Sequence, residues 1–188
     1  MIDFNKLQDS RTLRQELGIQ IRWRALSSKG GITKLCAYQD ARDVQKVLDH
    51  VCGITNWENE AMNLNGKLYM QIRIRTDEGW VSKSDVGTES NVEAVKGESS
   101  DAFKRAAVMF GIFRDLYDMD YIVLKNDGRD PITPEGITLK TPEAINLYCN
   151  SISAPMGTLK RLYQQLPKPV SEEITEIFTK LKEYVKSI

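Results

Sequence analysis

The sequence predicts an α+β protein with a β-β-β-α core, an additional N-terminal strand and helix, and an α-helical C-terminal region. The first observation is Asn65-Gly66 between two alternating segments, since both central residues of a type I′ hairpin turn need positive φ. The second is a run of apolar residues at three- and four-residue spacing up to Phe110, after a third alternating segment. Together they indicate a three-stranded meander followed by one amphipathic helix.

Caps and alternation predict the elements that precede this core. Ser10 and Asp40 can begin helices that Gly18 and Gly53 end. Between these helices, apolar and basic residues alternate over 19–24, which is typical of a strand with one basic face. The elements expected before the hairpin are a helix over 10–17, a strand over 19–24, a flexible loop over 27–31, a strand over 33–38 and a helix over 41–52.

The meander and its helix carry basic side chains on elements that otherwise pack. The expected strands cover 57–64, 67–76 and 80–86. Arg73 and Arg75 alternate with isoleucines in the middle strand, so that strand also has a basic face. In the helix, Lys96, Ser100 and Lys104 follow at four-residue steps and therefore share one flank. Cations on a rigid scaffold suit a repeated anion, and a sugar-phosphate backbone is the obvious candidate.

Composition bounds the function classes. The 26 basic and 26 acidic side chains cancel, which argues against a histone-like coat of charge but allows a local basic groove. Three widely spaced cysteines and one histidine indicate neither a disulfide framework nor a zinc site, so we expect no metal, no cofactor and a reducing cytoplasm. Neither a signal peptide nor an apolar run of roughly 20 residues occurs, so we expect no secretion and no membrane span.

A polar segment with two prolines and two glycines predicts a domain boundary. The expected divisions are a core domain over 1–125, a linker over 126–136 and a helical region over 137–188. Thr141-Pro142 and Ser171 can begin helices in that region. An apolar stripe between them comprises Leu159, Leu162 and Leu166. The regular apolar side of the last helix must be buried on this chain, on a neighbouring subunit, or on a partner such as a single-strand-binding protein or a recombinase.

Five short motifs follow one another through residues 10–121. They are Ile21-Arg22-Trp23-Arg24, then Tyr38 to Val44, then Leu48 to Gly53 with Asn56-Trp57, then Asp85 to Ser90, then Lys96-Gly97 with Ser100 to Ala106. In this order and spacing they resemble the DNA single-strand annealing proteins of the Rad-fifty-two (Rad52) superfamily, in particular the short phage-type, Sak-like branch.

The resemblance implies an oligomeric ring that holds single-stranded DNA in a basic outer groove, with phosphates inward and bases outward. It implies a non-enzymatic protein that anneals complementary strands in homologous recombination and repair without ATP or metal. The absence of a Gly-x-x-x-x-Gly-Lys-Ser/Thr loop agrees with the independence from ATP. The longer eukaryotic members also have an extended tail for recombinase binding. This sequence lacks that tail, which bears on any role as a recombinase mediator.

The resemblance assigns DNA contacts to basic residues of the first strand and the long helix. Arg24 matches the family's arginine before the glycine-rich loop, and Lys104 and Arg105 match the basic pair of the helix. Lys96 lies at a further basic position of that helix, and Lys29 lies in the loop that would approach the strand. The remaining candidates are Arg22, Arg42, Arg73, Arg75 and Lys83. A one-residue slip of the hairpin register would reverse the strand faces among them.

Other interpretations of the residues stay open. The order β-β-β-α also occurs in double-stranded RNA-binding modules. A metal-dependent nuclease is a second alternative, and its candidate carboxylates are Asp85, Glu89, Glu98 and Asp101. The basic residues can also be solvated faces paired with carboxylates. We expect the tryptophans to be core or subunit-interface residues rather than base-stacking platforms; they are Trp23, Trp57 and Trp80.

Overall fold

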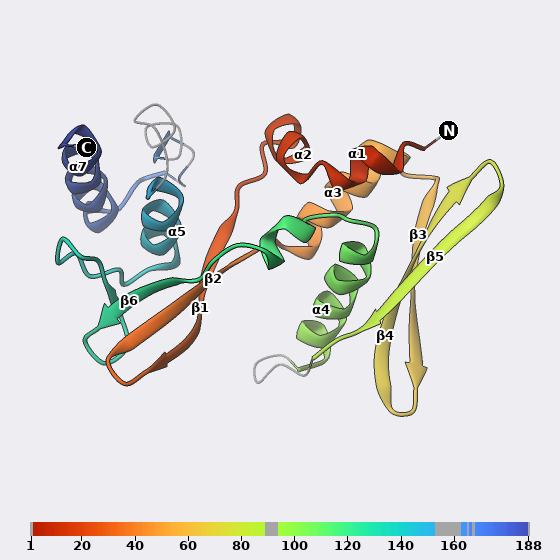
Figure 1. The fold of residues 1–188 in the computed structure, drawn as a ribbon, viewed down its shortest axis with the longest axis horizontal. Coiled ribbons are helices and arrows are strands. Elements are labelled where there is room, and N and C mark those ends of the chain that lie inside the picture. The colour runs from red at the N-terminus through yellow and green to blue at the C-terminus, as the bar shows by residue number, and fades with distance from the viewer. Residues whose placement is uncertain (1, 89–93, 153–162, 165, 167, 188) are drawn as a thin grey trace. The chain divides into compact units, whose positions relative to one another are not determined.

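The computed structural model describes residues 2–88, 94–152, 163–164, 166 and 168–187, apart from the side chains of 94–96 and 184–187. The chain folds into two compact units, each assembled from segments distant in sequence (Figure 1). The first unit comprises Met1–Gln20 and Gln39–Asp118, and the second comprises Ile21–Tyr38 and Met119–Ile188. No helix in the described part of the chain is long and apolar enough to cross a membrane.

The first unit contains the predicted β-β-β-α core. Its antiparallel sheet has the order β3-β4-β5, and α4 lies along one face of that sheet (Figure 1). At the β3–β4 turn, Asn65 has φ 54° and Gly66 has φ 74°, which confirms the hairpin prediction. The elements of this unit are α1 (Phe4–Gln8), α2 (Ser10–Leu17), α3 (Ala41–Cys52), β3 (Trp57–Leu64), β4 (Lys67–Thr76), β5 (Gly79–Val86), α4 (Ala94–Met109) and the 3₁₀ turn η1 (Arg114–Tyr117).

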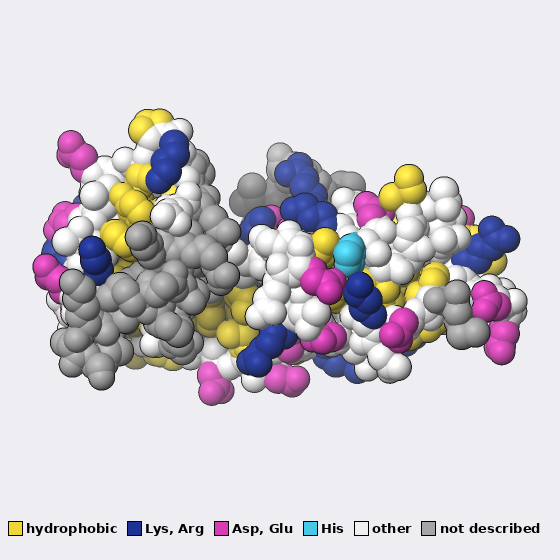
Figure 2. Space-filling view, turned by 90° about the horizontal axis from the view of Figure 1, so that it is seen from above, with side chains coloured by type: hydrophobic (Ala, Val, Ile, Leu, Met, Phe, Trp, Pro, Cys, Tyr) yellow, Lys and Arg dark blue, Asp and Glu magenta, His cyan; other side chains and the backbone are white. Residues whose placement is uncertain are grey.

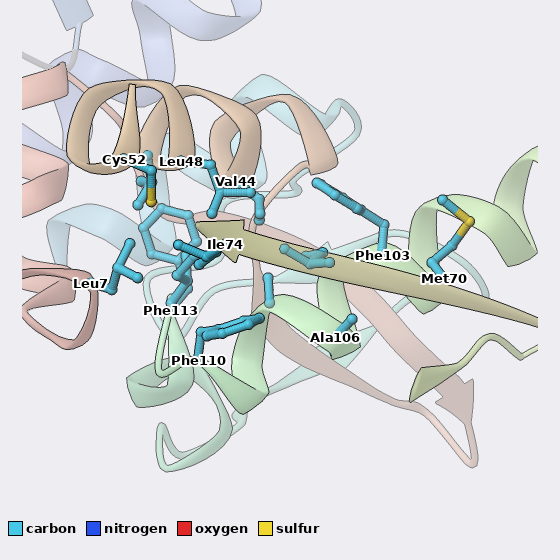
Figure 3. Close-up of a cluster of buried hydrophobic side chains, with 14 of the residues drawn as sticks. Leu7, Val44, Leu48, Cys52, Met70, Ile74, Phe103, Ala106, Phe110 and Phe113 are labelled. Carbon is cyan, nitrogen blue, oxygen red and sulfur yellow. The ribbon is translucent and has the colours of Figure 1, made fainter. Parts of the chain in front are cut away.

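The core of the first unit lies between the sheet, α3 and α4. Ile72 and Ile74 of β4 are fully buried, and they belong to one cluster with Leu48 of α3 and Phe103 and Ala106 of α4. Figure 3 shows side chains of this cluster converging from the helices onto β4. Because side chains alternate along a strand, this burial directs the intervening polar residues of β4 to the opposite face of the sheet.

The second unit packs the C-terminal helices on a second antiparallel sheet, of order β1-β2-β6-β7. Trp23 of β1 is buried, and its indole Nε1 donates to the Asn150 side-chain oxygen of α5 at 3.1 Å. The backbone amide of Trp23 donates to the Asn146 side chain at 2.6 Å. Trp23 is therefore a core residue, as predicted. The elements are β1 (Arg22–Lys29), β2 (Ile32–Tyr38), β6 (Ile122–Asn126), β7 (Pro131–Ile132), α5 (Pro142–Ser151) and α7 (Glu172–Ser187).

The first strand pair differs from the prediction. The segment expected as a flexible loop over 27–31 is mostly strand, because β1 stays paired with β2 as far as Lys29 opposite Ile32. The pairing of β1 with β2 is irregular at one place only, a register shift between Ala25 and Ser27, and the strand continues beyond it. Only Gly30 and Gly31, with φ 62° and 75°, form the turn. The strand also begins at Arg22 rather than at residue 19.

The segment predicted as a linker takes part in the second sheet. Within 126–136, β7 pairs with β6, and Thr133 is buried. The two compact units thus divide the chain differently from the predicted boundaries at 125 and 137, because the strands of 21–38 share a core with residues after 119. Polar and proline-rich composition does not distinguish a linker from a short edge strand with tight turns.

The last helix begins as predicted and buries its apolar side within the chain. The Ser171 hydroxyl accepts from the backbone amide of Ile174 at 3.3 Å, as an N-cap does. Ile174, Ile177 and Leu181 are buried in the second core beside α5. Of the predicted apolar stripe, Leu166 packs against this core, whereas Leu159 and Leu162 lie outside the described residues.

Candidate nucleic-acid interface

Three strands of the second unit place a group of cations on one sheet face. In β2, Thr33 and Leu35 are fully buried, so the Lys34 side chain between them points to the opposite face. The register sets Arg24 opposite Cys36, and it sets Lys29 and Lys125 on either side of Ile32, on that same face. We name this surface the basic sheet face. Its cations are Arg22, Arg24, Lys29, Lys34 and Lys125.

A buried threonine fixes the three strands that carry this face. The Thr33 hydroxyl of β2 lies 2.8 Å from the hydroxyl of Ser28 in β1. It also accepts from the side-chain amide of Asn126 in β6 at 3.0 Å. Because a buried hydroxyl without a partner is costly, these contacts disfavour a slipped register. The spacing of the cations on the opposite face is therefore set by the core side of the sheet.

The basic sheet face is poor in negative charge. No strand position on it is occupied by aspartate or glutamate; the nearest acidic residues along β6 are Asp120 and Asp127. Among the described residues, no carboxylate forms an ion pair with Arg24, Lys29, Lys34 or Lys125. Four cations therefore lie on this face without a carboxylate in ion-pair distance among the described residues.

Two cations of this face lie over aromatic rings. The Arg24 guanidinium carbon is 5.4 Å from the centre of the Tyr38 ring. The Lys34 ammonium nitrogen is 3.8 Å from the centre of the Tyr121 ring. Cation–π contacts attract and orient a cation without neutralising its charge. Both cations thus stay available to an anionic ligand while their side chains are held at the sheet.

The predicted basic pair of the long helix lies in the first unit. Arg105 of α4 is half-buried, and its guanidinium is 3.3 Å from a carboxylate oxygen of Asp85 in β5. Its Nε atom is buried and has no hydrogen-bond partner in the described part of the chain. Lys104 is also half-buried. The side chain of Lys96 lies outside the described residues.

The hairpin register settles the faces of the strand candidates. Arg73 and Arg75 of β4 point away from the core, and Arg73 pairs with Glu58 at 2.6 Å. Lys83 of β5 lies opposite buried Ile72, on the helix side of the sheet. Its ammonium donates to the carbonyl oxygen of Met109 at the end of α4, at 2.5 Å. A lysine there satisfies a terminal helix carbonyl and favours the helix dipole.

The remaining predicted residues lie at the surface of the first unit. Arg42 is exposed on α3. Trp80 of β5 is 40 % exposed with the Arg73 guanidinium 5.1 Å from its ring, so it is not a core residue. Trp57 is half-buried against the first core and donates to Asp49 at 2.8 Å, which fits the prediction of a packing role.

A close contact ties the end of β5 to the long helix beside two of the candidate nuclease carboxylates, Asp85 and Asp101, whereas Glu89 lies outside the described residues. A Cβ atom built on Gly87 would lie 2.2 Å from the backbone carbonyl oxygen of Glu98, so only glycine fits. Asp101 accepts from the amide and the hydroxyl of Thr88, and Asp85 pairs with Arg105. Within the described residues, no group of three or more histidine, cysteine, aspartate or glutamate side chains could hold a metal ion.

A surface cluster joins the first three helices of the first unit. Glu16 lies 2.9 Å from the His50 imidazole and 3.4 Å from the Lys6 ammonium. The hydrogen bond from His50 lowers the pKa of the Glu16 carboxyl, and Lys6 adds to this. Figure 2 shows the histidine, in cyan, at the surface beside acidic and basic side chains. The cluster contains one histidine and one carboxylate, and its contacts link α1, α2 and α3, so we assign it to packing of the helices.

The structure adds two cations that sequence reasoning missed. Lys34 and Lys125 lie on the basic sheet face, yet neither was a candidate. The alternation of Ile32, Thr33, Lys34 and Leu35 could have placed Lys34 on the face opposite Leu35. Lys125 could not be placed, because its position depends on the pairing of β6 with β2, across most of the first unit in sequence.

Comparison with known proteins identifies the family. The sequence profile of the Rad52/22 family of double-strand break repair proteins matches residues 9–131. The chain belongs to this family. The predicted family is thereby confirmed, and the Rad52/22 region includes β1 to β6 together with α4, so it carries both the basic sheet face and the basic pair of the helix. It ends before α5 and α7.

Two curated relatives of this Rad52/22 chain are bacterial. The chain is 36% identical over 104 residues to the single-stranded DNA-binding protein DdrA of Deinococcus deserti, covering 53% of this chain and 51% of the relative. It is 36% identical over 103 residues to DdrA of Deinococcus radiodurans, covering 53% of this chain and 49% of the relative. The chain thus spans about half the length of the curated relatives it matches. The phage-type branch stays a prediction.

Proposed function

We propose that this protein binds single-stranded DNA and anneals complementary strands in recombinational repair. The observation that carries the proposal is the basic sheet face, whose strand positions hold cations and no carboxylate. Membership of the Rad52/22 family and similarity to two single-stranded DNA-binding proteins support it. The residues would act by binding, without covalent chemistry, so the protein is a binding protein rather than an enzyme.

The contacts of this face suit phosphates. Each of four cations on this face can neutralise a phosphate and release counterions; they are Arg24, Lys29, Lys34 and Lys125. On a single strand, each such contact makes the slope of log K against log salt concentration more negative by about 0.7. Phosphate contacts carry no sequence information. Binding is therefore expected to tolerate any sequence, as annealing of arbitrary strands requires. Lys104 and Arg105 of α4 are the further contacts in this proposal.

Annealing would proceed without nucleotide hydrolysis, on an oligomeric ring that holds one strand extended. Extension by phosphate contacts leaves base edges free to pair, so the protein lowers the entropic cost of bringing strands together. Any protein partner of the C-terminal helices would meet their polar side, because Ile174, Ile177 and Leu181 are buried in the second core. A single-strand-binding protein or a recombinase remains the partner class of this proposal.

The first test measures binding as a function of salt. Fluorescence anisotropy with labelled oligonucleotides would compare the unchanged protein with the double variant Arg24→Ala/Lys29→Ala. Two lost contacts should reduce the salt slope by about 1.4, equally for every sequence. The control is Lys182→Ala, an exposed cation of α7. Equal salt slopes for the unchanged protein and the double variant would remove the basic sheet face from the proposal.

The second test measures annealing. Complementary strands should anneal faster with the protein present, at the same rate with or without ATP, and negative-stain images should show rings. A rate that requires ATP hydrolysis would contradict the mechanism. Preference for A-form duplex RNA over single-stranded DNA in competition would favour the RNA-binding alternative instead.

A further inference from the structure

We propose that Tyr121 is a stacking platform for one base of the bound strand, and that Lys34 holds the phosphate of the same nucleotide. This inference rests on the proposed function, because it names residues that position the DNA on the basic sheet face. It differs from a purely phosphate-bound strand, since it brings at least one base onto the protein surface at the second unit.

Tyr121 lies at the surface of the second unit rather than in its core. It precedes β6 and is 50 % exposed, although it adjoins a core that buries Leu124 and Trp23 of the same sheet. A tyrosine that served the core would bury its ring and keep its hydroxyl hydrogen-bonded. The Tyr121 ring instead lies beside Lys34, whose side chain belongs to the basic sheet face. The ring therefore stands among cations at the surface.

Lys34 and Tyr121 lie close enough to contact one nucleotide together. The Lys34 ammonium lies 3.8 Å from the centre of the Tyr121 ring and therefore covers one face of it. A base would stack on the other face of this half-exposed ring, with the phosphate of the same nucleotide within reach of the lysine. Val123 follows Tyr121 by two residues, lies opposite Lys34 in the register and is 57 % exposed. An apolar side chain at that place extends the surface on which a base can lie.

The Tyr121 ring lies among the cations of the basic sheet face. An exposed cation–π pair alone contributes little to folding, so stability does not explain why the ring is kept at the surface. Nucleic acid is the ligand that needs both groups, because its backbone is anionic and every base has a face that stacks on an aromatic ring. Sequence tolerance is preserved, since stacking does not read base edges.

The test separates stacking from phosphate binding with two single-stranded probes of equal length and charge. One is oligothymidylate and the other is an abasic oligonucleotide, which keeps the phosphates and lacks the bases. Tyr121→Leu should lower affinity for oligothymidylate about tenfold and leave affinity for the abasic probe unchanged. Tyr121→Phe should retain the affinity for both probes. Lys34→Ala should lower both affinities by the same factor and reduce both salt slopes by about 0.7.

The controls make each outcome decisive. Lys182→Ala removes an exposed cation of α7, outside the basic sheet face, and it should change the affinity for neither probe. Equal losses on both probes, or no loss on either, for Tyr121→Leu would overturn the inference. Failure of the unchanged protein to bind either probe would instead refute the proposed function.

A measurement on the unchanged protein covers the case in which Tyr121→Leu does not fold. Oligothymidylate in which iodouracil replaces single bases would be irradiated with the protein, and the crosslinked peptide would be identified by mass spectrometry. A crosslink at Tyr121 supports stacking, because photocrosslinking to an aromatic ring needs close contact with the base. Efficient crosslinks that all map to other residues would overturn the inference.

Discussion

Replacing Gly87 with alanine should destabilise the junction between β5 and α4. The new Cβ would lie 2.2 Å from the carbonyl oxygen and 2.9 Å from the carbonyl carbon of Glu98, which are backbone atoms inside a helix. A backbone cannot move aside as a flexible side chain can, so the helix must shift on the sheet. Overpacking of this kind costs about 3 kcal/mol, at the upper end of its usual range. For a chain of this length the melting temperature should fall by roughly 6–12 °C.

Thermal unfolding of Gly87→Ala and of the unchanged protein would be compared at equal concentration, since assembly also shifts the melting temperature. The control Thr88→Ala removes the hydroxyl that donates to Asp101 at 3.0 Å but adds no atoms near Glu98, and it should cost about 1 kcal/mol or less. If Gly87→Ala melts within about 1 °C of the unchanged protein, the close approach of β5 and α4 is wrong, together with the reason for glycine there.

Two further predictions concern groups that act on stability rather than on DNA. Lys83→Ala should lower the melting temperature by roughly 2–4 °C through loss of the bond to Met109, and it should leave the salt slope of DNA binding unchanged; a reduced slope would return Lys83 to the binding surface. Burial raises the pKa of Cys52 to about 11 and that of Cys149 to about 12, so both thiols ionise more readily in the unfolded chain. Unfolding free energy should therefore fall as pH rises above the ordinary thiol pKa of 9.0, by up to about 1.4 kcal/mol per pH unit for each thiol. Urea titrations on both sides of that pH would measure it, and an equal pH dependence in a Cys52→Ala/Cys149→Ala variant would contradict it.

Local chemistry made much of the first unit predictable. The turn at Asn65-Gly66 fixes its own geometry, because positive φ at two successive residues selects one hairpin type, and the strand bounds follow from it. Residue type also predicts the cap at Asp40 and, in the second unit, the cap at Ser171, although Asp40 makes no side-chain cap hydrogen bond. The cap of α2 was placed one residue late, since Asp9 rather than Ser10 accepts from Thr12. Ser10 instead turns inward, where its hydroxyl accepts from the amide of Phe113.

The candidate site was less accessible to sequence reasoning, because faces depend on pairing between distant segments. The residues around Lys125 do not indicate that β6 pairs with β2. Those around Lys83 likewise do not indicate that its ammonium contacts the end of α4. The segment around Ser27 was expected as a loop because its residues are polar. It is strand because it pairs with β2, and the residue types of the segment do not indicate this pairing. The family resemblance is what predicts DNA contacts for Arg24, Lys104 and Arg105. The periodicity of the sequence shows only that basic residues share one face of an element.

The second unit assembles late in synthesis. Trp23 and Leu35 leave the ribosome early, but the core that covers them includes Leu147 and Leu181. Until those residues emerge, the hairpin of β1 and β2 exposes an apolar face on one side and its cations on the other. Contacts of such wide sequence separation slow folding and prolong exposure to aggregation. A chain cut after Lys125 would remain permanently in that state. The basic sheet face thus takes four of its five cations from residues 22–34, whereas the core beneath it is completed only by residues as far along as Leu147 and Leu181.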